Sequence, residues 1–379
     1  MSANGLPAGT PPIIEARGLH RRFGGRRGLF RTEPTVHAVN DVSIAVRPGE
    51  TFAIVGESGC GKSTLGRLLL RLIEPNEGRV LYKGRDITDI SKGEMRKLRR
   101  EMQIIFQDPF ASLNPRMSVS DIVGEPVRLH GLARGGQVNE RVAELLRTVG
   151  LRPEFAARYP HEFSGGQRQR IGIARALASE PDLVIGDEPV SALDVSVQAQ
   201  VINLLEELKD RLGLTLVIVA HDLAVIRHMS DRVAVMYLGE MVELAGVDEL
   251  YDNPLHPYTQ ALLKAIPSPT VGERGPRELL QGDVPSPTAL PSGCRFHTRC
   301  PHARPRCSSE HPSLQAVEGG RRVACHFWRE IADAGASAPV LASAVGTRRE
   351  MRLDLYKRAQ AGRVSSLPVA GRQAVSAQG

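Results

Sequence analysis

The sequence predicts an α/β fold, and three observations support this prediction. A glycine-rich loop, Gly56–Thr64, lies between an apolar strand pattern and a helix pattern. A second apolar strand pattern, Asp182–Gly186, ends in two carboxylates. Strand and helix patterns alternate along most of the chain, as they do where helices connect parallel strands. The expected core is therefore a parallel sheet with helices on its faces.

Length and composition favour a cytosolic protein with two regions. The chain has 379 residues, of which 41% are hydrophobic, enough for a full α/β domain and a smaller second region. It has no apolar run of 18 residues, and residues 1–10 lack the pattern of a secretion signal. We therefore expect a soluble protein whose five cysteines are thiols, suited to metal binding or catalysis rather than to disulfides.

The positive charge is unevenly distributed. The net charge is +7 and the isoelectric point is near 9.4. Residues 333–379 hold seven Arg and Lys against three Asp and Glu, so this tail supplies +4 of the total. Aromatic residues make up 4% of the chain and do not alternate with basic ones, so no platform for stacking bases is visible. We expect no direct binding of nucleic acid.

The N-terminal residues predict a disordered start followed by two extended segments. Residues 1–11 are small and rich in Gly and Pro, and we expect them to be unordered. Extended segments are predicted over 13–23 and 42–46, the second closed by the turn Arg47–Glu50. Between them, the Arg- and Gly-rich residues 24–35 predict a loop insertion.

The loop Gly56–Thr64 has the spacing G-x-x-x-x-G-K-[ST], which is typical of phosphate-binding loops. It follows a strand predicted over 51–55 and precedes a helix predicted over 65–72, the order that such a loop requires. Inward-pointing N–H groups of a glycine-rich turn can enclose a triphosphate, and the helix N-terminus favours its negative charge. We call this segment the phosphate loop and expect it to bind ATP.

Residues of the phosphate loop have distinct expected roles. Lys62 would contact the β- and γ-phosphates, Ser63 would bind Mg²⁺ and Thr64 would contact the α-phosphate. Cys60 occupies a variable position, and we interpret it as a small residue rather than a nucleophile. The loop residues expected at the ATP are Gly56, Ser58, Gly59, Cys60, Gly61, Lys62, Ser63 and Thr64.

A helical subdomain is predicted after the phosphate loop. Short strands are expected over 78–84 and 102–106. Apolar residues then recur three and four positions apart, which predicts helices over 119–130, 138–149 and 165–178. These helices would form a subdomain, at about 108–178, inserted between strands of the core.

Asp187 and Glu188 directly follow the buried strand pattern 182–186. Carboxylates at this position suit a site where Mg²⁺ and an attacking water meet a phosphate. We expect Asp187 to support the Mg²⁺ coordination shell. Glu188 is expected to be the general base, a role worth roughly 10²–10⁴-fold in rate. A solvated acidic turn at the end of the strand is the alternative.

The remaining core elements end where the composition changes. A long amphipathic helix is predicted over 195–211, ended by Gly213, and a central strand over 214–220. A hairpin is expected around residues 238–240. After Asn253–Pro254 the composition shifts to Pro, His and Cys, which sets the predicted domain boundary. The predicted domains are a core at 12–253, a Pro- and Cys-rich region at 254–330 and a flexible basic tail at 331–379, with one possible helix at 347–360.

Ser164–Gln167 places a capping serine and two glycines before a strong helix, which predicts a second anion site. With this segment the chain resembles the ATP-binding subunit of an ABC transporter from about residue 12 to residue 250. The residues that carry the resemblance are Gly56–Thr64, Gln107, Ser164–Gln167, Asp187, Glu188, Ser191–Asp194 and His221. The resemblance implies an ABC-type P-loop NTPase core with an antiparallel β subdomain and the inserted helical subdomain.

The resemblance also implies a head-to-tail dimer that closes on ATP and opens after hydrolysis. Each ATP would lie between the phosphate loop of one subunit and the second anion site of the other. The residues expected to face the other subunit's ATP are Ser164, Gly165, Gly166, Gln167 and Asp194, the last coupling the two sites.

Three further residues receive roles from the resemblance. Phe23 would stack on adenine, and His221 would contact the γ-phosphate. Gln107 would sense Mg²⁺ and the attacking water while touching the membrane subunit. The alternatives are a core aromatic for Phe23, a helix-capping residue for His221 and a strand-end amide for Gln107.

Three segments resemble the dipeptide/oligopeptide uptake branch of this family. They are Phe106–Arg116, Asn253–Thr259 and the Pro-Ser-Gly-Cys-Arg-Phe-His run at Pro291–His297. The implied assembly has a second ATP-binding subunit, identical or different, two transmembrane permease subunits and an extracytoplasmic binding protein. The chain would then lie on the cytoplasmic face of the membrane. Nickel and glutathione uptake branches share much of this pattern, and the sequence does not name the cargo.

Four cysteines lie within one short stretch, Cys294, Cys300, Cys307 and Cys325. Their spacing, C-x5-C-x6-C-x17-C, suggests one metal site and leaves zinc and an iron–sulfur cluster equally open. Resemblance to peptide-uptake ATPases implies a [4Fe-4S] cluster, which would stabilise a segment too small to form its own core. Unmetallated or disulfide-bonded cysteines are the remaining alternative. His297, His302 and His326 are possible substitute ligands.

Two competing classes of protein share the nucleotide motifs. A soluble ABC-type ATPase acting on nucleic acid or ribosomes would have these motifs but not the segment 253–325. A redox or iron–sulfur sensor with vestigial ATPase parts is disfavoured, because every expected catalytic position has the matching residue.

Overall fold

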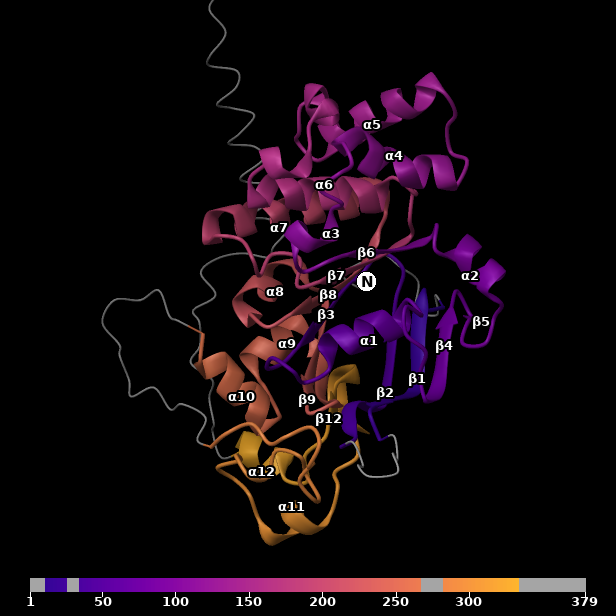
Figure 1. Ribbon diagram of the computed structural model, residues 1–379. Helices are drawn as coiled ribbons and strands as arrows, with labels where there is room; N and C mark the ends of the chain where they lie inside the picture. The colour runs from indigo at the N-terminus through magenta and orange to yellow at the C-terminus, as the bar shows by residue number, and fades with distance from the viewer. Residues whose placement is uncertain (1–10, 26–33, 267–281, 334–379) are drawn as a thin grey trace, which may run out of the picture. The chain divides into compact units, whose positions relative to one another are not determined.

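The computed structural model describes residues 11–25, 34–266 and 282–333, all of which belong to one compact unit, Met1–Ala338 (Figure 1). Several predictions made from the sequence concern residues outside these ranges. Residues 1–10 of the N-terminus, residues 26–33 of the insertion and residues 334–379 of the tail lie outside the described residues.

Among the described residues, eight strands form the central sheet, in the order β11-β12-β10-β9-β3-β8-β7-β6. The five neighbours from β9 to β6 run parallel, and β10, β12 and β11 extend the sheet with antiparallel pairs. The strands are β3 (Thr51–Val55), β6 (Met102–Ile105), β7 (Leu183–Asp187), β8 (Thr215–Ala220), β9 (Arg232–Tyr237), β10 (Glu240–Gly246), β11 (Gln315–Ala316) and β12 (Arg322–Val323). The predicted α/β class is confirmed.

A second sheet of four strands has the order β2-β1-β4-β5, and all of its pairs are antiparallel. Its strands are β1 (Ile14–Phe23), β2 (Val36–Val46), β4 (Glu77–Tyr82) and β5 (Arg85–Asp86). β2 begins six residues before the predicted start at 42, because its first half pairs with β1 down to Phe23–Val36. The polar residues Asn40 and Asp41, with Asp41 at φ 50° beside a register shift, concealed this half of the strand.

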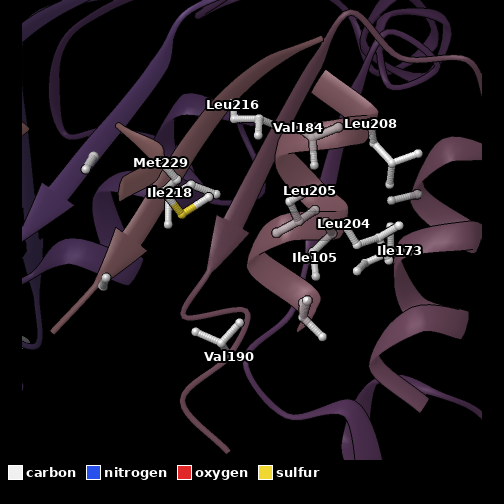
Figure 2. Close-up of a cluster of buried hydrophobic side chains, with 14 of the residues drawn as sticks. Ile105, Ile173, Val184, Val190, Leu204, Leu205, Leu208, Leu216, Ile218 and Met229 are labelled. Carbon is white, nitrogen blue, oxygen red and sulfur yellow. The ribbon is translucent and has the colours of Figure 1, made fainter. Parts of the chain in front are cut away.

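The central sheet has an apolar core on each face. Alternate residues of a strand point to opposite faces, so Ala53 and Val55 of β3 join one core and Phe52 and Ile54 join the other. Figure 2 shows part of the first core, which contains Leu204, Leu205 and Leu208 together with Val184, Leu216 and Ile218 of the sheet. This double burial explains the unbroken apolar runs of the central strands.

Two helices cover opposite faces of the central sheet, one packing in each apolar core. α1 (Lys62–Leu69) follows Gly61, three residues before the predicted start at 65. α7 (Val195–Leu212) is capped by Asp194 at its start and by Gly213, at φ 66°, at its end. The predicted end of this helix at Gly213 is confirmed.

The expected helices of the middle region are present. They are α4 (Val119–Leu129), α5 (Gly136–Thr148) and α6 (Gly165–Leu177), with the short α3 (Pro109–Ser112) before them. Figure 1 shows α4 and α5 at one end of the described unit, with α6 between them and the sheet. A short helix, α2 (Lys92–Leu98), begins at a capping box of Ser91 and Glu94 that sequence reasoning did not use.

The region after residue 253 extends the central sheet. β12 pairs with β10, and β11 pairs with β12. The buried Glu243 of β10 accepts hydrogen bonds from the backbone of Leu255 and His256 and from Arg321. The short helices beyond β8 are α8 (Leu223–Met229), α9 (Val247–Asp252), α10 (Pro257–Lys264), α11 (Pro305–Ser309) and α12 (Trp328–Asp333). The boundary at 253 stays a prediction. Within the described ranges, no helix combines the length and apolarity needed to cross a lipid bilayer.

Candidate nucleotide and catalytic site

Two glycines of the phosphate loop are required by its backbone. Gly56 has φ 155° and Gly61 has φ 102°. A side chain at Gly56 would overlap the carbonyl oxygen of Met236, and one at Gly61 would overlap that of Ala38. These close approaches hold the turn against β9 and β2.

Lys62 lies at the centre of this loop. Its side chain is buried, and its ammonium donates hydrogen bonds to the carbonyl oxygens of Gly56 at 2.7 Å and Glu57 at 2.8 Å. The Cys60 thiol is also buried, which raises its pKa. A neutral buried thiol agrees with its interpretation as a small residue.

Ser63 and Asp187 bring two oxygen ligands together between α1 and β7. The Ser63 hydroxyl donates to Asp187 Oδ1 at 2.6 Å, and the carboxylate is 3% exposed. Arg67 approaches its other oxygen at 3.8 Å. A hydroxyl and a carboxylate beside a triphosphate loop form a donor set that suits Mg²⁺.

Gln107 and His221 both contact one carboxylate oxygen of Glu188. Oε2 of Glu188 accepts a hydrogen bond from Nε2 of Gln107 at 3.0 Å and lies 3.1 Å from Nδ1 of His221. The three residues follow the carboxyl ends of β7, β6 and β8, which are adjacent in the sheet. Parallel strands thus deliver to one point residues that are far apart in the sequence.

The backbone of Glu188 adopts an uncommon conformation, with φ 47°. Its N–H donates to Val219 at 3.0 Å, while its carbonyl oxygen accepts from the backbone and the hydroxyl of Ser191. Non-glycine residues in this region carry strain that neighbouring structure must hold in place. These three hydrogen bonds hold the Glu188 backbone in this conformation.

The phosphate loop faces Glu188, Gln107 and His221 across an open cleft. Phe23 lies at its edge with 37% of its surface exposed, so it is not a core aromatic. The guanidinium of Arg21 covers its ring at 4.5 Å. The lining residues are Phe23, Val36, Ala38, Ser58, Gly59, Gly61, Lys62, Ser63, Thr64, Gln107, Glu188 and His221.

Most of the predicted ATP-site residues therefore lie together, with three exceptions. The exceptions are Gly56, Cys60 and Asp187, which do not line the cleft. Cys60 and Asp187 are buried. Sequence reasoning missed Val36 and Ala38. Recognising that β2 starts at Val36 would have placed them at the site, but the polar residues Asn40 and Asp41 concealed this half of the strand.

The second predicted anion site lies elsewhere on the chain. Ser164 caps α6, its hydroxyl accepting from Gln167 N–H at 3.4 Å while Gln167 accepts from Ser164 N–H at 3.1 Å. A side chain at Gly166 would overlap Val197 of α7. Asp194 accepts hydrogen bonds from the Val197 N–H and the Ser196 hydroxyl, and both of these lower its pKa. None of these residues lines the cleft described above.

Comparisons with known proteins agree with this geometry. The family model for the ABC transporter matches residues 39–191, and that for the oligopeptide/dipeptide transporter C-terminal region matches residues 242–307. The chain is 54% identical over 327 residues to the oligopeptide transport ATP-binding protein AppF of Bacillus subtilis, a match that covers 85% of this chain and 99% of the relative. The chain belongs to the ATP-binding subunits of the oligopeptide/dipeptide ABC transporter family.

Other members and solved structures extend the comparison. The probable peptide ABC transporter ATP-binding protein y4tS of Sinorhizobium fredii is 52% identical over 332 residues, covering 87% of this chain and 94% of the relative. A dimeric post-hydrolysis structure of the ATP-binding cassette MJ0796, bound to ADP and Pi, has a TM-score of 0.55 at 30% identity, covering 62% of this chain and 99% of that one. The structure of cbiO1 from Clostridium perfringens has a TM-score of 0.55 at 28% identity, covering 64% and 91%. The protein is an ATPase of this family.

The four clustered cysteines of this ABC subunit line one small cavity. Burial raises the pKa of Cys300 to about 12 and that of Cys325 to about 11, and it also raises the pKa of Cys294. The three substitute ligands named from the sequence, His297, His302 and His326, line the same cavity. Over the described ranges, no three or more His, Cys, Asp or Glu side chains are arranged to hold a metal ion. The four cysteines line one cavity but are not arranged here as a metal site, so the metal stays a prediction.

Proposed function

We propose that this ATPase powers the import of peptides across the cytoplasmic membrane. The observation that carries the proposal is that one chain combines this nucleotide cleft with the region matched over 242–307 by the oligopeptide/dipeptide model. The relatives named for peptide transport match it along 85% and 87% of its length. Membership of the oligopeptide/dipeptide transporter family supports separate membrane subunits as the path of translocation.

The cleft residues divide the work of hydrolysis. Lys62 binds the β- and γ-phosphates, and Phe23 stacks on adenine at the cleft edge. Ser63 and Asp187 hold Mg²⁺, which neutralises charge on the phosphates when it is bound. Gln107 lies beside Glu188 and senses Mg²⁺ and the attacking water.

Glu188 is the general base of this mechanism. Its Oε2 accepts the proton of the water that attacks the γ-phosphate. His221 and Gln107 hold that carboxylate from two sides, and both reach the cleft. Because Glu188 is anchored through its own backbone, its carboxylate is positioned before ATP arrives.

The second half of each ATP site comes from another ATP-binding subunit. Ser164–Gln167 and Asp194 lie outside the cleft that their own chain forms, so they are available to an ATP held by a partner. The dimeric MJ0796 cassette supports a paired arrangement. ATP binding then closes the dimer, hydrolysis opens it, and two permease subunits convert the motion into transport.

An extracytoplasmic binding protein delivers the peptide, and the ATPase remains peripheral on the cytoplasmic face.

Glu188→Gln tests the assignment of the base. This variant should retain ATP binding and lose roughly 10²–10⁴-fold in turnover, because the amide accepts no proton. Phosphate release and nucleotide affinity are measured together, with Lys62→Ala as the variant that loses affinity. Glu154→Gln, an exposed carboxylate outside the cleft, is the matched control. Normal hydrolysis by Glu188→Gln would refute the assignment.

The cargo is tested in vesicles that contain the co-purified complex. Labelled dipeptides and oligopeptides should enter in an ATP-dependent manner, and unlabelled peptides should compete. Competition by Ni²⁺ or glutathione, without competition by peptide, would favour those uptake branches. Affinity for DNA over a salt series tests the alternative of an ATPase acting on nucleic acid, whose binding would weaken steeply with salt.

The four cysteines hold a [4Fe-4S] cluster in this proposal, with zinc as the alternative. Four thiols at one cavity supply the donor set that both groups use. Cys294, Cys300, Cys307 and Cys325 would be its ligands, and a bound cluster would stabilise the region that carries them. Anaerobic purification followed by iron, sulfide and zinc analysis decides between them. Zinc without iron would overturn the cluster.

A further inference from the structure

The phosphate loop is held by residues that follow the core in the sequence. Nη1 and Nη2 of Arg299 donate to the two carboxylate oxygens of Glu57, at 2.7 and 3.0 Å. Glu57 is the second residue of the phosphate loop. A guanidinium bound to a carboxylate through two parallel hydrogen bonds fixes direction as well as distance. The Arg299 side chain is 6% exposed, so this is a largely buried contact.

Tyr258 of α10 holds the same residue through its backbone. The buried Tyr258 hydroxyl accepts a hydrogen bond from the Glu57 N–H at 2.9 Å. Its ring packs on Tyr237, with centroids 4.7 Å apart, and on Phe296, at 5.3 Å. Phe296 precedes Arg299 in one turn, in which the Arg299 N–H donates to the Phe296 carbonyl at 3.0 Å. One aromatic cluster therefore locates both contacts to Glu57.

These contacts continue to the lysine of the ATP site. The Glu57 carbonyl oxygen accepts from the Lys62 ammonium at 2.8 Å, so Glu57 links Arg299 and Tyr258 directly to Lys62. Neither Arg299 nor Tyr258 lines the nucleotide cleft. They therefore act on ATP through the shape of the loop and not by touching it.

We infer that Arg299 and Tyr258 are positioning residues for ATP binding, which makes the C-terminal region a structural part of the nucleotide site. With Glu57 held, the loop N–H groups and Lys62 stay in a binding-competent arrangement. Without these contacts, part of the binding free energy of ATP is used to order the loop. Glu188, Gln107 and His221 are untouched, so the chemical step on bound ATP is preserved.

The test compares KM for ATP, kcat and thermal stability in the full chain. Arg299→Met should raise KM about tenfold, equivalent to about 1.4 kcal/mol, with kcat within about twofold of the unchanged protein. Tyr258→Phe keeps the aromatic packing and removes the hydroxyl, and should raise KM by about threefold. Arg306→Met is the matched control, because Arg306 lies in the same region and pairs with Glu310 at the surface. It should leave KM unchanged.

A double-variant cycle separates positioning from a general loss of structure. Glu57→Gln should raise KM as Arg299→Met does, and the two changes together should add little to either. Arg299→Met with lower thermal stability but unchanged KM would overturn the inference, as would an equal rise in KM for Arg306→Met. If Arg299→Met does not fold, Tyr258→Phe and Glu57→Gln decide the question, and unchanged KM in both would refute it. Lys62→Ala reports separately on the ATP site itself.

Discussion

At the scale of single residues, the site depends on backbone conformations that side-chain chemistry does not reveal. Glu188 occupies the left-handed region, and Gly56 and Gly61 have positive φ at points of close backbone approach. The motif spacing identified the glycines, because their role in such loops is general. The strained turn at Glu188 has no such sequence signal.

Gly61→Ala tests the requirement for glycine in the loop. The added methyl group would overlap the Ala38 carbonyl and would force a side chain into a positive φ of 102°. ATP affinity should fall at least about tenfold, since the loop must move to relieve the overlap. Gly172→Ala in α6 is the control, because its methyl group would enter open space. It should bind ATP normally and gain up to about 1 kcal/mol in stability. Equal affinity in the two variants would contradict the argument.

His311 and Glu240 form a pH-sensitive contact between the C-terminal region and β10, at 2.7 Å. The hydrogen bond to Glu240 raises the pKa of His311 above 6.5. Burial favours a higher pKa for Glu240, but hydrogen bonds from His311 and Asn40, with the nearby charges, lower it below 4.5. Arg295 also pairs with Glu240 and opposes protonation of His311, whereas Asp41 favours it.

The stabilising effect of this contact should therefore fall at both ends of the pH range. The His311 contribution is complete below pH 6.5 and is lost as pH rises through its folded pKa, while the Glu240 contribution is lost as pH falls below 4.5. Thermal unfolding at about pH 5.5 and about pH 8.5 should show a smaller pH dependence in His311→Gln than in the unchanged chain. An identical pH dependence would rule out this contact as its source.

At the scale of elements, the sequence predicted best where one physical rule governs a segment. β3 lies at the predicted 51–55. All five of its residues are buried, which accounts for the mainly apolar run that predicted a strand. α7 has amphipathic spacing and recognisable caps at Asp194 and Gly213. The first half of β2 and the short elements after 253 were missed, because tertiary pairing and not local pattern sets them. β12 has two residues, and its strand state exists through β10.

The packing of α6 on α7 depends on a glycine. A methyl group at Gly166 would overlap Val197, whereas one at Gly165 would lie 3.4 Å from Leu193, close to ordinary contact. Gly166→Ala should therefore lower the free energy of unfolding by about 1–3 kcal/mol, and Gly165→Ala by less. Adding Val197→Ala should restore part of the loss, because it removes the overlapping methyl group. Denaturant unfolding gives the free energy of unfolding of the unchanged protein, of each glycine variant and of the double variant Gly166→Ala with Val197→Ala. Absence of rescue would show that Gly166 serves another purpose.

At the scale of the whole molecule, the site was predictable up to the point where distant segments meet. The motifs located Lys62, Ser63 and Glu188, and the parallel topology brings Gln107 and His221 to Glu188. The contacts of Glu57 were not predictable, since Tyr258 and Arg299 are 201 and 242 residues away in the sequence. No periodicity or spacing links positions that far apart. The C-terminal region, interpreted from the sequence as a metal-bearing appendage, is part of the same sheet and contacts the phosphate loop.

The cysteine cavity gives a test of that integration. Cys300 directly follows Arg299, and Cys294 precedes Phe296 by two residues, so the segment that contacts Glu57 and the aromatic cluster lies between two proposed ligands. Loss of the metal would free both ends of this segment. Cys307→Ser, which alters the cavity without changing that segment, should lower the metal content, the thermal stability and the ATP affinity together. Cys60→Ser lies outside the cavity and should keep the metal. If Cys307→Ser loses metal but retains both stability and ATP affinity, the metal does not hold the region against the phosphate loop, and Phe296 and Tyr258 are sufficient to place Arg299.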